Sequence, residues 1–130
     1  MAEKLVVDAS AMVDYLVKSP LAPSIGARIA SGEVHVPAHF DAEVLSALGR
    51  LNRAEALSES EVEERLELTA AAPFRRHLLV PLLPGGWRLR HNVRVVDALY
   101  IELAIQLEAM IITTDAGMAS ASPDADLVGD

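Results

Sequence analysis

The sequence predicts an α/β domain whose central, mainly parallel β-sheet is flanked by α-helices on both faces. Two observations favour this class: short apolar segments alternate with longer segments of helical periodicity, and the order strand, helix, strand recurs along the chain. A third is size. With 130 residues and a hydrophobic content of 52%, the chain fits one domain with a core of its own, and we expect a single domain over residues 1–130.

In the first half of the chain, each element follows from a local pattern. The run KLVV predicts a buried strand that ends at Asp8, and Pro20 and Gly32 mark the ends of the two helices that follow. The motif SESE, a serine with a glutamate three residues later, is typical of a helix start. We expect strands at 4–7 and 33–37 and helices from residue 10 to before Pro20, at 23–31, 38–53 and 58–72.

The second half continues the alternation. We expect a strand or strand edge at 77–83, a break at the PGG of 84–86, a short helix or loop at 87–92, a helix starting at Asp97, and strands at 109–114 and 125–128. The segment DALYIELAIQLE is apolar on nearly every side, which indicates a buried helix. In open parallel sheets, ligands bind beyond the carboxyl ends of the strands. Asp8 and Asp115 both fall at such ends.

The composition restricts the chemistry of any site. There is no cysteine, so disulfides and thiolate metal sites are excluded, and a metal would be held by carboxylates and the four histidines. Mg²⁺ or Mn²⁺ is therefore the expected ion. No stretch approaches the roughly 18 apolar residues of a membrane span, and we expect a cytoplasmic protein with no membrane partner.

Charge is distributed unevenly along the chain. The net charge of −8 argues against a broad nucleic-acid-binding surface. Residues 69–96 contain five arginines and no acid, however, whereas seven acids and no lysine or arginine follow Val96. This division predicts either a basic strip beside an acidic pocket or simply a solvated basic face.

Four acids stand out by their positions. Asp8 and Asp115 end predicted strands, Asp97 starts the buried helix, and Glu43 shares a helix face with apolar residues. Structural roles are open for three of them, because Asp8 and Asp97 suit helix N-caps and Asp115 suits a turn. If all four converged within about 5 Å, each ionised pair would repel by roughly 3 kcal/mol at an effective dielectric constant near 20. One or two divalent ions would relieve this repulsion and support hydrolysis of a phosphodiester.

The order of four short motifs resembles the PIN domains of VapC toxins over essentially the whole chain. The motifs are VVDAS, FDAEVLSAL, VVDALYIELA and IITTDAGM. The resemblance implies that Asp8, Glu43, Asp97 and Asp115 form an acidic quartet around Mg²⁺ or Mn²⁺, with Ser10 and Thr113 as supporting hydroxyls. It also implies a PIN fold, an endoribonuclease acting on RNA, a homodimer, and a small antitoxin whose C-terminal tail occupies the active-site groove.

Within this resemblance, Arg94 is a candidate contact for an RNA phosphate, with Arg90 behind it, although both suit the acidic groups of an antitoxin equally well. One departure concerns the residues after Asp115. Relatives commonly carry a basic residue there, whereas this chain has Ala116 to Met118. This departure keeps a second hypothesis open, a catalytically weak or inactive binding module of the same fold.

Two other classes use strand-end aspartates with Mg²⁺. A phosphoacceptor receiver domain and a haloacid-dehalogenase-type phosphatase both need a lysine late in the chain, but Lys4 and Lys18 are the only lysines. The phosphatase also needs an aspartate at position 10, which is serine. Both classes are therefore disfavoured.

Overall fold

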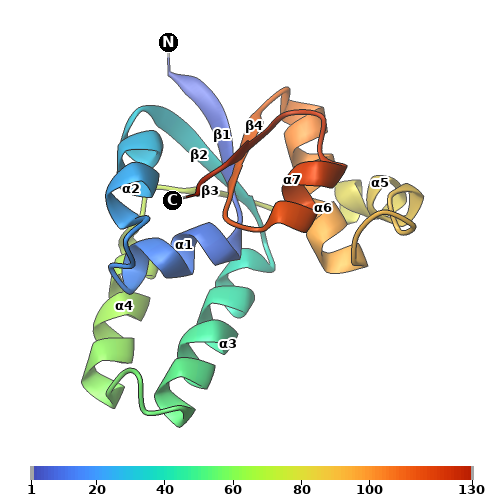
Figure 1. Ribbon diagram of the computed structural model, residues 1–130. Helices are drawn as coiled ribbons and strands as arrows, with labels where there is room; N and C mark the ends of the chain where they lie inside the picture. The colour runs from blue at the N-terminus through green and yellow to red at the C-terminus, as the bar shows by residue number, and fades with distance from the viewer. Residues whose placement is uncertain (1, 130) are drawn as a thin grey trace.

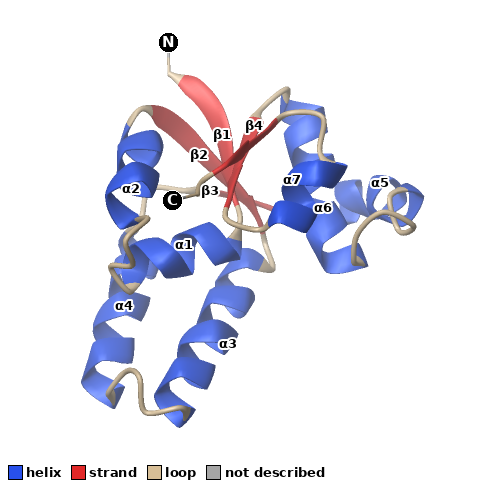
Figure 2. Ribbon diagram, in the orientation of Figure 1, coloured by secondary structure: helices blue, strands red, loops and turns tan. Residues whose placement is uncertain are grey.

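The computed structural model describes residues 2–129 and contains one five-stranded sheet, coloured red in Figure 2. Its strands are β1 (Glu3–Val7), β2 (Gly32–Pro37), β3 (Arg75–His77), β4 (Met110–Thr113) and β5 (Ala125–Leu127). They lie in the order β3-β2-β1-β4-β5, and every neighbouring pair is parallel. The predicted fold class is confirmed.

Helices connect the strands and flank the sheet (Figure 1). They are α1 (Ala9–Leu16), α2 (Ala22–Ala30), α3 (Phe40–Arg53), α4 (Glu59–Ala71), the 3₁₀ turn η1 (Val80–Leu82), α5 (Leu83–Arg88), α6 (Val95–Leu107) and α7 (Ala116–Ala121). Helices α3 and α4 form a hairpin that projects beyond the sheet (Figure 1). No helix within residues 2–129 is long and apolar enough to cross a membrane.

The core lies on both faces of the central strands. Consecutive residues of β1 (5–7) and of β4 (111–113) are buried, which requires cover on each face because neighbouring side chains point in opposite directions. Helix α6 buries every residue from 98 to 104, as its apolar sequence predicts. The capping box at Ser58 is also confirmed, since Ser58 Oγ accepts from the backbone N–H of Glu61.

The prediction for residues 77–86 is wrong in two respects. The strand lies earlier, at Arg75–His77, and pairs with the outer edge of β2. Pro81 cannot donate to a strand ladder and instead lies in the first turn of η1. The PGG of 84–86 does not break the chain but belongs to α5. Gly85 is required there because a Cβ atom at this position would lie 2.1 Å from Cδ of Glu102 on α6.

Two helix starts also differ from the prediction. Helix α6 begins two residues early, at Val95, so its N-cap is Arg94 and the N-cap role considered for Asp97 is wrong. Helix α7 has no counterpart in the prediction. It begins where Asp115 accepts from the backbone N–H groups of Gly117 and Met118.

Candidate active site

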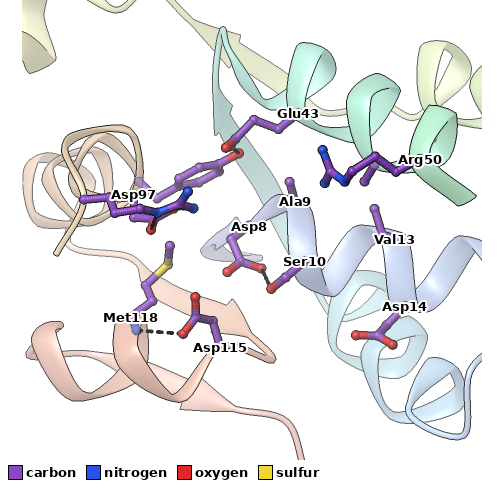
Figure 3. Close-up of a pocket in the computed structure, with 13 residues that line it drawn as sticks. Asp8, Ala9, Ser10, Val13, Asp14, Glu43, Arg50, Asp97, Asp115 and Met118 are labelled. Carbon is purple, nitrogen blue, oxygen red and sulfur yellow. Dashed lines mark hydrogen bonds and ion pairs between the residues drawn. The ribbon is translucent and has the colours of Figure 1, made fainter.

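A cavity of about 330 Å³ opens beyond the carboxyl ends of β1 and β4, the two central strands (Figure 3). All four acids of the predicted quartet line it: Asp8, Glu43, Asp97 and Asp115. Each comes from a different part of the fold, namely the end of β1, helix α3, helix α6 and the start of α7. The parallel topology therefore brings together residues that are far apart in the sequence.

Asp8 is the most buried of the four, with 2% of its surface exposed. It is the N-cap of α1 and accepts from the backbone N–H of Ala11 at 2.9 Å, from Ser10 Oγ at 2.8 Å and from Thr113 Oγ1 at 2.5 Å. Burial raises the pKa of Asp8, these three hydrogen bonds oppose the rise, and the charge of Asp115 adds to it. The carboxylate is fixed in place at an electrostatic cost, which a nearby cation would relieve.

Thr113 links Asp8 to Asp115. Its Oγ1 donates to Asp8 and accepts from the backbone N–H of Asp115 at 2.9 Å. Asp115 Oδ1 accepts from the backbone N–H of Gly117 at 2.8 Å. The capping roles considered for Asp8 and the local role considered for Asp115 are thus real, and they orient the same side chains that line the cavity.

Glu43 is held by a residue that sequence reasoning missed. Tyr100, buried in α6, donates from its hydroxyl to Glu43 Oε1 at 2.6 Å. Burial and the neighbouring Glu43 raise the pKa of Tyr100 far above its ordinary range, so the phenol stays a hydrogen-bond donor. The signal in the sequence was spacing, because Tyr100 follows Asp97 by three residues and so shares its helix face.

Asp97 carries an ion pair with Arg94. The guanidinium donates through Nε to Asp97 Oδ2 at 3.0 Å and through Nη2 to Oδ1 at 3.3 Å, and Arg94 is 75% exposed whereas Asp97 is 14% exposed. The hydrogen bonds to Asp97 and then the charges of Asp97, Glu43 and Asp115 raise the pKa of Arg94. Arg94 is therefore a positive charge that Asp97, Glu43 and Asp115 share.

The remaining predicted residues divide into two groups. Ser10 lines the cavity, where its Oγ donates to Asp8 and accepts from Thr114. Arg90 does not line it but stacks over Trp87, with Cζ 4.0 Å from the ring centroid. Trp87 is itself 60% exposed and so lies outside the core of the chain. A second residue that the sequence did not single out, Arg50 of α3, lines the cavity instead.

The donor set fits a hard divalent cation. Carboxylate oxygens are the ligands that Mg²⁺ and Mn²⁺ prefer, and the pKa of Asp8 is raised by burial and, to a smaller extent, by the charge of Asp115. As the side chains stand, no three histidine, aspartate or glutamate residues within 2–129 converge closely enough to chelate an ion. Arg94 engages both carboxylate oxygens of Asp97 and so competes with an ion for this carboxylate.

Comparison with known proteins gives three concordant findings. Residues 5–122 match the family model of the PIN domain. The chain is 48% identical over 128 residues to Ribonuclease VapC3 of Mycobacterium tuberculosis, covering 98% of this chain and 93% of the relative. Two solved structures share the fold. PAE2754 from Pyrobaculum aerophilum has a TM-score of 0.75 and 18% identity, and the match covers 98% of this chain and 92% of that one. VapBC2 from Rickettsia felis, bound to a promoter DNA fragment, has a TM-score of 0.72 and 11% identity, and the match covers 97% of this chain and 99% of that one.

Proposed function

We propose, since this chain belongs to the PIN-domain family, that it is a Mg²⁺- or Mn²⁺-dependent endoribonuclease and the toxin of a VapBC-type toxin-antitoxin pair. One observation carries the proposal: the four carboxylates of the quartet, from four separate elements, line a single cavity at the carboxyl edge of the sheet, together with Asp14 of α1. The high identity to a relative named as a VapC ribonuclease over nearly the whole chain supports RNA as the substrate.

In this proposal, Asp8, Asp97 and Asp115 hold the ion, and Glu43 acts on the attacking water. A bound divalent cation supplies an activated water and neutralises charge on the phosphodiester. Tyr100 occupies Glu43 Oε1, which leaves Oε2 to accept a proton from that water. Glu43 also faces His39, whose Nε2 lies 3.6 Å from Oε1.

Ser10 and Thr113 are positioning residues. Each hydroxyl donates to a different oxygen of Asp8, Ser10 to Oδ1 and Thr113 to Oδ2. With both oxygens held, the carboxylate of Asp8 cannot rotate freely. Such support of a ligand carboxylate typically changes metal affinity or activity 10- to 100-fold when it is removed.

The partners follow from the same family. We infer a cytoplasmic protein that forms a homodimer and is neutralised by a VapB-like antitoxin. Arg94 is exposed at the cavity and fits an RNA phosphate or an antitoxin carboxylate once it leaves Asp97. Arg90 lies farther out, on Trp87, where it fits the antitoxin better than the reacting phosphate. Exposed Val80, Leu83 and Trp87 form an apolar surface that supports a dimer or antitoxin contact.

One observation favours a second function, that of a catalytically inactive binding module. Helix α7, which follows Asp115, begins with Ala116, Gly117 and Met118, so no basic side chain there can contact a phosphate. A binding module of the same fold that keeps its acids but cleaves nothing would have this property.

The experiment that separates the two functions is induced expression of the wild-type chain beside Asp97→Asn, with sequencing of new RNA 5′ ends. Asp124→Asn is the matched control, because it removes a carboxylate outside the cavity. We expect growth arrest and discrete cuts with wild type and Asp124→Asn, and neither with Asp97→Asn. No arrest and no new ends with folded, antitoxin-free wild-type protein would support the binding module instead.

A further inference from the structure

Two basic side chains line the cavity, and they come from opposite walls. Arg94 belongs to the α6 side, next to Asp97, whereas Arg50 projects from α3. Figure 3 shows Arg50 and Asp97 on opposite sides, with Asp8 and Ala9 between them. An elongated ligand that reaches both arginines must therefore pass over the acids.

The two arginines differ in their partners. Arg94 makes a bidentate ion pair with Asp97. Arg50 donates through Nη1 to Ser46 Oγ at 2.9 Å, a neutral acceptor, and takes part in none of the ion pairs found within residues 2–129. A guanidinium has five N–H donors, so Arg50 offers an exposed and largely unused cation to a ligand in the cavity.

Spacing along α3 determines which part of a ligand Arg50 meets. Glu43, Ala47 and Arg50 all line the cavity, on successive turns of α3. At 1.5 Å of rise per residue, the backbone of Arg50 lies about 10 Å along the helix from that of Glu43. The Arg50 side chain reaches back to Ser46, which places its charge about one helical turn beyond Glu43. Small apolar side chains, Ala9, Val13 and Ala47, line the space between. They leave room for a strand. Asp14 of α1 also lines the cavity and would repel a phosphate, which favours a path along the α3 side, where Arg50 lies.

We propose that Arg50 binds an RNA phosphate adjacent to the scissile one, so that the RNA strand runs from the acidic quartet along the groove between α1 and α3. This inference rests on the proposed function, because it assumes that the scissile phosphate lies at the acids. RNA is favoured over an acidic peptide because phosphates repeat along the strand at every nucleotide, which lets one occupy the metal site while a neighbour meets Arg50. The contact is independent of base identity and sets the path of the strand.

The test measures RNA binding and cleavage with Arg50→Gln, and uses Arg53→Gln as the matched control. Arg53 has the same charge and lies on the same helix, but it is outside the cavity. Binding of a fluorescein-labelled single-stranded RNA 12-mer is titrated in Mg²⁺ over a range of NaCl concentrations. The Asp97→Asn background is used for this titration so that the RNA stays intact.

We expect Arg50→Gln to weaken binding about five- to tenfold at low salt, and to reduce the slope of log affinity against log salt by about 0.7, the value of one phosphate contact on a single strand. In the active chain, KM should rise while kcat changes little, because the contact forms before and persists through the reaction. Arg50→Lys should retain most of the slope, since it retains the charge, and Arg53→Gln should match the parent chain.

Two results would overturn this inference without affecting the proposed function. In the first, the chain cleaves RNA, but Arg50→Gln binds RNA as tightly as Arg53→Gln does. In the second, Arg50→Gln weakens only the binding of an acidic peptide, such as a glutamate 12-mer, and leaves RNA binding unchanged. A chain that cleaves nothing, but whose RNA affinity and salt slope depend on Arg50, would overturn the proposed function and leave the RNA contact standing.

Discussion

Replacing Tyr100 by phenylalanine removes one hydroxyl and tests whether the orientation of Glu43 matters. The phenol is buried in α6 and donates to Glu43 Oε1 at 2.6 Å. Hydrogen bonds to charged groups contribute about 1.5–3 kcal/mol. Because the Glu43 side chain is 29% exposed and water can replace the lost donor, we expect the lower end, about 1.5 kcal/mol. For 130 residues this corresponds to a fall in Tm of about 5 °C.

The effect on activity should be larger than the effect on stability. Without its donor, Glu43 can rotate away from the attacking water, and loss of such a supporting hydrogen bond typically costs 10- to 100-fold in activity. The assay pairs differential scanning calorimetry without divalent metal with cleavage of an RNA oligonucleotide in Mg²⁺. Tyr15→Phe is the control, because Tyr15 is the other tyrosine and is 41% exposed.

The pH dependence provides an independent check. Burial, and then the hydrogen bond to Glu43, raise the pKa of Tyr100 above its ordinary value of 10.0. The neutral phenol therefore stabilises the fold fully below pH 10, and this stability is lost as the unfolded chain ionises above pH 10. Tyr100→Phe should therefore lose less stability than wild type above pH 10. If Tyr100→Phe cleaved RNA at the wild-type rate despite the expected fall in Tm, the role assigned to Glu43 and its orientation would be refuted.

Three further changes test the electrostatics and the packing. Asp8→Asn should abolish cleavage. Without divalent metal, its Tm relative to that of wild type should rise between pH 3.8 and pH 7, because burial raises the pKa of Asp8 and ionisation then costs the wild-type fold stability that the amide does not lose. A difference in Tm that stays constant with pH would contradict this. Arg94→Gln should increase Mg²⁺ affinity by up to about fivefold in a calorimetric titration, which corresponds to the loss of an exposed ion pair worth about 1 kcal/mol. Unchanged affinity would show that the Arg94–Asp97 pair does not compete with the ion. Gly85→Ala should lower the free energy of unfolding, measured in urea, by about 1–3 kcal/mol, because its Cβ would meet Glu102. Gly49→Ala, whose Cβ would have only a distant contact, should raise the free energy of unfolding by about 0.5–1 kcal/mol. Equal effects of the two substitutions would refute the close approach of Glu102 to Gly85.

The sequence determined the alternation of strands and helices outside the segment 75–88 and α7, and it placed Asp8 and Asp115 correctly at strand ends. Asp8 and Asp115 could be placed at strand ends because a run of apolar residues followed by a carboxylate is a local pattern. The parallel sheet followed from the alternation of strands and helices, and with it the edge at which ligands bind. Asp8, Glu43, Asp97 and Asp115 line one cavity at this edge. Their roles in metal binding and catalysis stay a prediction.

Contacts between distant residues were decided by the tertiary structure. Tyr100 and Glu43 are 57 positions apart, and no periodicity specifies which buried hydroxyl meets which acid. The packing of α1 against α3 determines which turns of α3 face the cavity. The role proposed for Arg50 depends on this packing. Gly85 lies in a helix that packs against α6, where the Glu102 side chain leaves no room for a Cβ atom, although the PGG pattern alone favours a break. Local sequence specifies which faces are buried, whereas the partner of each buried or charged group is specified only when the elements pack.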